Sequence, residues 1–127
     1  MTIQAYKSVR RSTLVEGASP HQLITMLYDG AISNIAIARQ HIANNNRDQM
    51  HRHIDKSVAI VQELQASLKD YESNELAGNL FELYSYIVNT MIAANQNRDD
   101  EGLVTCSNLI SILRDAWQAI APEQVAA

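Results

Sequence analysis

Apolar residues recur along this chain at intervals of three and four positions, the repeat of an α-helix that buries one face. The repeat is clear through Ile54, Val61 and Leu68, and again from Leu103 to Ile120. Polar stretches separate the periodic segments. The spacing predicts four long helices, over residues 20–44, 48–70, 75–95 and 100–120.

The start of the first long helix carries a specific signal. Ser19 suits the N-cap, Pro20 suits the first helical position, and Gln22 completes a capping box. The run Asn44–Asn46 is expected to end this helix, since asparagine tolerates the left-handed conformation. Residues 1–18 are expected to form a short N-terminal helix or an irregular lead-in.

The connections between the predicted helices are short, so neighbouring helices should run antiparallel. Glycine (4) and proline (2) are too scarce for the frequent turns of a sheet protein. The length of 127 residues corresponds to one domain. The sequence therefore predicts an all-α, antiparallel up-down four-helix bundle that occupies residues 1–127 as a single domain.

The predicted helices 20–44 and 75–95 have more apolar surface than a bundle core requires. Tyr28 lies beside the stripe that contains Leu27, and Phe81 and Tyr84 lie beside the stripe of the third helix. A second apolar strip must be covered by a neighbour or remain as an interaction site, and a partner helix laid in a groove is one such cover. Gly30 also allows close approach, either of another helix of the bundle or of a partner chain.

The charge distribution argues against nucleic-acid binding. The chain has 10 basic and 14 acidic residues and a net charge of −4. The first 14 residues contain Lys7, Arg10 and Arg11 and no acid, so the remainder sums to −7. An acidic body does not suit a phosphate backbone, whose affinity comes from lysine and arginine.

Neither catalysis nor metal binding is indicated. His51 and His53 point about 200° apart on a helix, and no Glu-x-x-His motif is present. His21 and His41 are isolated in the sequence, so the histidines are expected at the surface. Cys106 falls on the apolar stripe of the last helix, where core packing is expected. We therefore expect no enzyme activity, no cofactor and no metal.

Two alternatives remain open from the residues alone. A regulatory or adaptor bundle, such as a histidine phosphotransfer domain, would use His51 or His53, near Arg52 and Lys56. A small metallo-bundle enzyme is the second. No apolar run is long enough for a membrane span and no signal peptide is apparent, so we expect a cytoplasmic protein without membrane insertion.

Several stretches resemble the flagellin-specific export chaperone family, FliS. The most specific is residues 18–30, ASPHQLITMLYDG. Supporting stretches are Ala5-Tyr6, residues 79–87 with Ala94-Asn95, and residues 113–117. The matching stretches cover essentially the whole chain in the right order.

The resemblance implies a bundle that binds the C-terminal segment of flagellin, prevents premature polymerisation and aids delivery to the flagellar type III export apparatus. It implies flagellin and export gate components as partners, with a homodimer left open. In this family the lead-in can lie over a binding groove. The candidate partner-binding residues carried over are Tyr6, Leu27, Tyr28, Ile32, Leu80, Tyr84 and Ile87.

Overall fold

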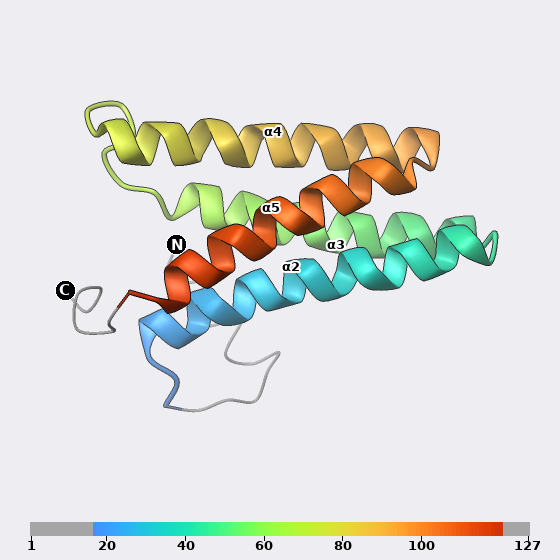
Figure 1. Ribbon diagram of the computed structural model, residues 1–127, viewed down its shortest axis with the longest axis horizontal. Helices are drawn as coiled ribbons and strands as arrows, with labels where there is room; N and C mark the ends of the chain where they lie inside the picture. The colour runs from blue at the N-terminus through green and yellow to red at the C-terminus, as the bar shows by residue number, and fades with distance from the viewer. Residues whose placement is uncertain (1–16, 121–127) are drawn as a thin grey trace.

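The computed structural model describes residues 17–120, and four helices make up most of this stretch (Figure 1). They are α2 (Pro20–Ala43), α3 (Arg47–Ala66), α4 (Glu75–Asn97) and α5 (Asp100–Gln118). No strand occurs within residues 17–120. The predicted all-helical bundle is confirmed. The predicted lead-in, residues 1–18, lies almost entirely outside the described residues.

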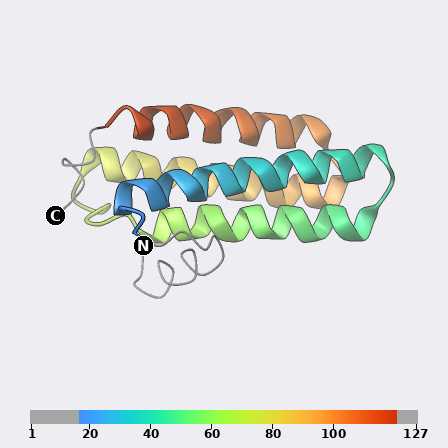
Figure 2. The same cartoon turned by 90° about the horizontal axis from the view of Figure 1, so that it is seen from below.

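Successive helices run antiparallel, and the two views show them side by side in an elongated bundle (Figures 1 and 2). α2 packs on α3 and α5, and α4 also packs on α3 and α5, so α2 and α4 are diagonal. The α4–α5 interface is the least extensive of the four. Of the four interfaces between neighbouring helices, the one between α4 and α5 therefore has the least packing.

The start of α2 follows the predicted capping box. The Gln22 backbone N–H donates to the Ser19 hydroxyl over 3.1 Å, and the Ser19 backbone N–H donates to the Gln22 side chain over 2.9 Å. Pro20 occupies the first turn, as expected. These bonds satisfy backbone donors that a helix start leaves free.

The predicted helix 48–70 is too long, since α3 ends at Ala66. The Ser67 hydroxyl donates to the Leu64 carbonyl over 2.6 Å, which competes with continued helix formation. Asp70 then takes a left-handed backbone conformation with φ of 56°. The apolar repeat continues through Leu68, which packs against the core from the connecting loop and gave the misleading signal.

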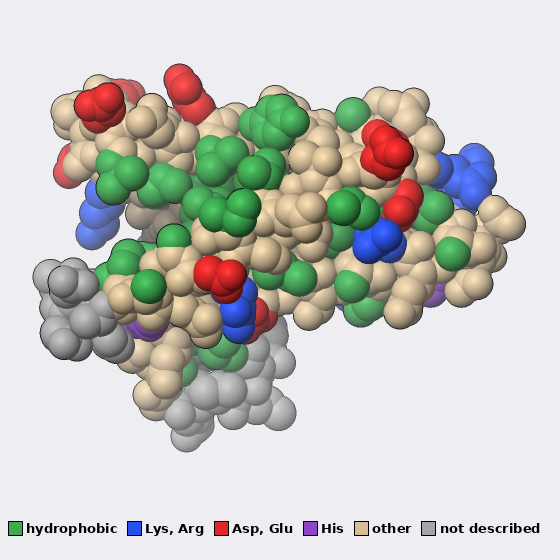
Figure 3. All heavy atoms as spheres, viewed as in Figure 1, with side chains coloured by type: hydrophobic (Ala, Val, Ile, Leu, Met, Phe, Trp, Pro, Cys, Tyr) green, Lys and Arg blue, Asp and Glu red, His purple; other side chains and the backbone are tan. Residues whose placement is uncertain are grey.

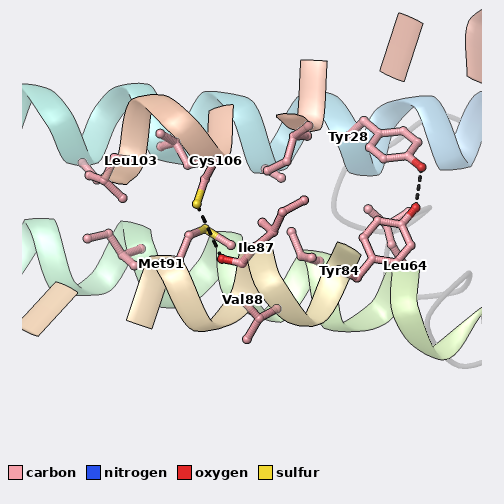
Figure 4. Close-up of a cluster of buried hydrophobic side chains, with 14 of the residues drawn as sticks. Tyr28, Leu64, Tyr84, Ile87, Val88, Met91, Leu103 and Cys106 are labelled. Atoms are coloured by element: carbon pink, nitrogen blue, oxygen red, sulfur yellow. Dashed lines mark hydrogen bonds between the residues drawn. The ribbon is translucent and has the colours of Figure 1, made fainter. Parts of the chain in front are cut away.

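The hydrophobic core lies between the four helices, and each helix contributes buried side chains to it (Figure 4). Cys106 is fully buried, which agrees with the packing role predicted for it. Its thiol donates to the Ile87 carbonyl over 3.5 Å. Ser57 is a buried polar residue whose hydroxyl donates to the Ala31 carbonyl over 2.9 Å. The largest fully buried apolar side chains are Ile35, Met50, Ile54, Val61, Leu64, Ile87, Met91, Leu103, Cys106 and Ile110.

α5 follows α2 along the bundle, and both diverge from α4 toward the end where residues 17 and 120 lie (Figure 1). We call this end, which also carries the α3–α4 connection, the wide end. At the wide end the first half of α4 is separated from the last half of α5. The apolar faces of these two half-helices are consequently less covered than the rest of the core.

Candidate functional site: an apolar strip between α4 and α5

The divergence of α4 and α5 leaves a set of apolar side chains between them. On α4, Leu80 and Leu83 share a helical face with Ile87, whose carbonyl contacts α5. On α5, Leu109 and Leu113 share a face with Cys106. We define the apolar strip as Leu76, Leu80, Leu83, Leu109, Ile112 and Leu113.

The strip is open to solvent at its edges. Leu76 is 69% exposed and Ile112 is 65% exposed, the highest values among the large hydrophobic residues of the described part. The other four are half-buried and pack against the core. Hydrophobic side chains gather along the boundary of α4 and α5 in the space-filling view (Figure 3). Contiguous exposed apolar surface of this kind marks interaction sites.

Three links attach α5 to α2. At the opposite end of the bundle, which we call the narrow end, Arg39 forms an ion pair with Asp100 over 2.8 Å. Near the middle of the wide half, Arg114 forms an ion pair with Asp29, which raises the pKa of the Arg114 guanidinium through their hydrogen bond. These pairs fix α5 on α2 rather than on α4.

The third link joins the start of α2 to the end of α5. His21 Nε2 donates to the Trp117 carbonyl over 2.9 Å, and Trp117 Nε1 donates to the His21 carbonyl over 2.9 Å. The two rings stack with centroids 5.1 Å apart. His21 is 9% exposed, so the expectation of a surface histidine is wrong here: the ring is buried because it packs on Trp117.

Tyr28 of α2 and Tyr84 of α4 meet inside the wide half (Figure 4). Their hydroxyls form a hydrogen bond over 2.6 Å across the diagonal of the bundle, and the two residues are only 5% and 3% exposed. Burial raises the pKa of both hydroxyls, that of Tyr84 most strongly. Two long side chains placed end to end thus fill the widened interior.

The structure separates the predicted partner-binding residues by depth. Leu27, Tyr28, Tyr84 and Ile87 are buried, while Ile32 and Leu80 are half-buried. Leu80 belongs to the apolar strip, and Tyr6 lies outside the described residues. Their role in partner binding stays a prediction.

Sequence reasoning missed Ile112, Leu109 and the His21–Trp117 contact. The apolar run 109–113 is wider than one helical stripe and signals the strip on α5. Surplus apolar surface is predicted on the first and third long helices. The third is α4, which carries Leu76, Leu80 and Leu83 of the strip, but the rest of the strip lies on α5 rather than on the first long helix, α2. The contact with Trp117 joins residues 96 positions apart, and nothing local in the sequence indicates it.

The remaining histidines make specific contacts. His53 Nδ1 lies 2.9 Å from Asn34 Oδ1, and its ring stacks on His41 with centroids 5.8 Å apart. His51 Nδ1 hydrogen-bonds to Asn95 Oδ1. Within residues 17–120 no three side chains of the histidine, cysteine or carboxylate type gather as a metal site.

Gly30 packs within the bundle. A Cβ at this position would lie 3.3 Å from the Ile60 side chain of α3, so the close approach expected there is made by another helix of the same chain. None of the described helices has the length and apolar character needed to cross a membrane.

Comparison with known proteins gives a consistent result. The family described as "Flagellar protein FliS" matches residues 2–124. The flagellar secretion chaperone FliS of Salmonella typhimurium is 34% identical over 122 residues, covering 95% of this chain and 90% of the relative. The flagellar secretion chaperone FliS of Bacillus subtilis is 30% identical over 125 residues, covering 98% and 92%. The chain belongs to the FliS family.

Proposed function

We propose that this protein is a cytoplasmic flagellar secretion chaperone that binds the C-terminal segment of flagellin. It holds the segment against the bundle, prevents premature polymerisation and presents it to the flagellar type III export apparatus. The role needs no cofactor and no catalysis. Support comes from the family membership, from the secretion-chaperone names of the relatives and from the apolar strip between α4 and α5.

The apolar strip is the observation that carries the proposal. Its α4 residues Leu76, Leu80 and Leu83 follow spacings of four and three, as in a surface that receives the anchors of an amphipathic helix. From Leu76 to Ile87 the face extends about 16 Å at ~1.5 Å per residue, about three turns of a docked helix. A helical client laid here would take the place that α5 leaves open beside α4.

An amphipathic segment needs such a surface before it assembles. Its apolar face is costly to leave in water and makes the free segment prone to association. The bundle supplies substitute packing at about 25 cal/mol for each Å² of apolar surface buried. Ordering a disordered client opposes binding, so an extended contact is required.

The first test is isothermal titration with a peptide from the C-terminal region of the flagellin of the same organism. We expect one-to-one binding with a negative heat-capacity change, because apolar surface is buried. The double variant Leu76→Glu/Ile112→Glu should weaken binding at least roughly tenfold, about 1.4 kcal/mol. Both side chains are mostly exposed, so the fold should be retained.

Ile92→Glu is the matched control. Ile92 is an exposed isoleucine of α4, 44% accessible, on the side away from α5. Its substitution should leave binding unchanged. Equal binding by the wild type and the strip variant would refute the apolar strip as the docking site. Loss of self-association in the strip variant, with no binding of flagellin by either protein, would instead assign the strip to a second copy of this chain.

A further inference from the structure

We propose that the two wide-end links, His21–Trp117 and Asp29–Arg114, hold the second half of α5 on α2 and thereby keep the apolar strip open. That the open strip serves to bind a client rests on the proposed function. The links themselves are defined by the contacts between α2 and α5. They make His21, Asp29, Arg114 and Trp117 positioning residues for the client site.

Some contact must oppose the movement of α5 onto α4, because that movement would bury the apolar strip. Six leucine and isoleucine side chains face the boundary of α4 and α5, and two of them are mostly exposed. Moving α5 onto α4 would remove apolar surface from water, which is favourable by about 25 cal/mol per Å². Without an opposing contact, the divergence of the two helices would be an unstable arrangement.

The opposing contacts occur where they are needed. Arg114 and Trp117 lie in the last two turns of α5, the part that diverges from α4. Arg114 reaches Asp29 of α2 and also donates to Asp115 and Gln118 of its own helix. This set of bonds fixes the guanidinium, so the ion pair also fixes the position of the helix.

The His21–Trp117 link is directional as well as apolar. Two reciprocal hydrogen bonds and a ring stack connect one residue in the first turn of α2 to one in the last turn of α5. A hydrogen bond to a backbone carbonyl requires a particular placement of the helix that carries it. Sliding α5 toward α4 would break both bonds at once.

The narrow end provides an internal contrast. There the Arg39–Asp100 pair also joins α2 to α5, but the Cys106 thiol reaches the Ile87 carbonyl of α4. In this half α5 is therefore held by both neighbours. Between α4 and α5, the mostly exposed side chains Leu76 and Ile112 lie in the half where these contacts hold α5 on α2 alone. The wide-end links and the open strip therefore coincide.

The spacing of α4 and α5 tests the proposal directly. Spin labels at Glu82→Cys on α4 and Ala116→Cys on α5, in a Cys106→Ala background, report the separation of the two half-helices by pulsed electron resonance. Both labelled positions are exposed. Thermal unfolding and circular dichroism of each labelled protein verify that the bundle is intact.

The variants His21→Phe/Trp117→Phe and Asp29→Asn should each shift the distance distribution toward shorter values. The paired phenylalanines keep two rings but lack both side-chain hydrogen bonds, and Asn removes the charge that pairs with Arg114. Arg39→Gln removes the corresponding link at the narrow end and should leave the distribution unchanged. An unchanged distribution in both wide-end variants, with intact folds, would overturn the proposal.

Binding of the flagellin peptide gives the second readout. If only about one tenth of a wide-end variant remains open, its apparent Kd should rise roughly tenfold, since binding must select the open fraction. A wild type that binds no flagellin peptide would contradict the proposed function. The distance measurement would still decide the role of the links, so the two failures are distinguishable.

Discussion

The hydroxyls of Tyr28 and Tyr84 are each the partner of the other in a core that is otherwise almost entirely aliphatic. Tyr84→Phe should therefore leave the Tyr28 hydroxyl buried without its partner. We expect a loss of about 1–3 kcal/mol in the free energy of unfolding, the desolvation penalty of an unsatisfied polar group. Urea unfolding measures this loss.

The double variant Tyr28→Phe/Tyr84→Phe should cost less than the sum of the single variants, because both hydroxyls are removed together. A double-mutant cycle gives the coupling energy. Additive losses would show that the hydroxyl pair is not a coupled unit.

Burial raises the pKa of the Cys106 thiol from 9.0 to about 11. The unfolded chain thus loses this proton at lower pH than the folded protein does. The contribution to stability is complete below pH 9.0 and is lost as the pH rises to about 11, at about 1.4 kcal/mol per pH unit.

The comparison of wild type with Cys106→Ala isolates this effect, since the alanine variant retains every other titratable group of the protein. The wild type should lose more stability than the variant between pH 9 and 11 in urea unfolding. Parallel pH profiles for the two proteins would contradict the assigned cause.

At the scale of single elements, the sequence predicted the presence of each helix better than the position of its ends. Periodicity and caps predict the four helices, and the start of α2 at Pro20 agrees with its capping box. The end of α3 could not be predicted because an apolar residue in a loop, Leu68, continues the helical repeat. The side chain of Ser67 decides that end through a bond that the repeat does not encode.

Two glycines of different helices should respond differently to alanine. A Cβ on Gly78 of α4 would lie 2.9 Å from the backbone carbonyl oxygen of Tyr71, whereas a Cβ on Gly30 of α2 would lie 3.3 Å from the end of the Ile60 side chain. A backbone atom yields less readily than a flexible side chain. We expect Gly78→Ala to destabilise by about 1–3 kcal/mol.

Gly30→Ala should change stability by less than about 1 kcal/mol, because the gain in helix propensity offsets the shift of Ile60. Thermal unfolding of the two variants in the same buffer makes the comparison. A larger loss for Gly30→Ala than for Gly78→Ala would contradict the packing described here.

For the bundle as a whole, the sequence predicted the all-helical class and spare apolar surface on the third long helix, α4, but not the spare apolar surface on α5. Spare surface depends on the angle between helices, and that angle depends on contacts such as Arg114–Asp29, whose partners are 85 positions apart. For this reason Leu80 was identified in the strip while Ile112 was not. The burial of Tyr84 and Ile87 likewise could not be read from their stripe alone.

The uneven closure of the bundle predicts uneven local stability along α5. Backbone amides of residues 111–118, which lie in the half beside the strip, should exchange hydrogen faster than those of residues 103–110. Exchange measured by mass spectrometry on peptic fragments tests this. The bound flagellin peptide should slow exchange in the second half of α5, and uniform protection along α5 in the free protein would contradict the expectation.

The stack of Trp117 on His21 also gives this protein a built-in optical reporter. Trp117 is the one tryptophan in the sequence, and it lies where α5 meets α2 beside the wide end. Its ultraviolet emission therefore comes from a single, known place. A change in the position of α5 on α2 should alter the wavelength and intensity of that emission, so no added label is needed. Rapid-mixing fluorescence can therefore measure the rate at which a client binds at the wide end.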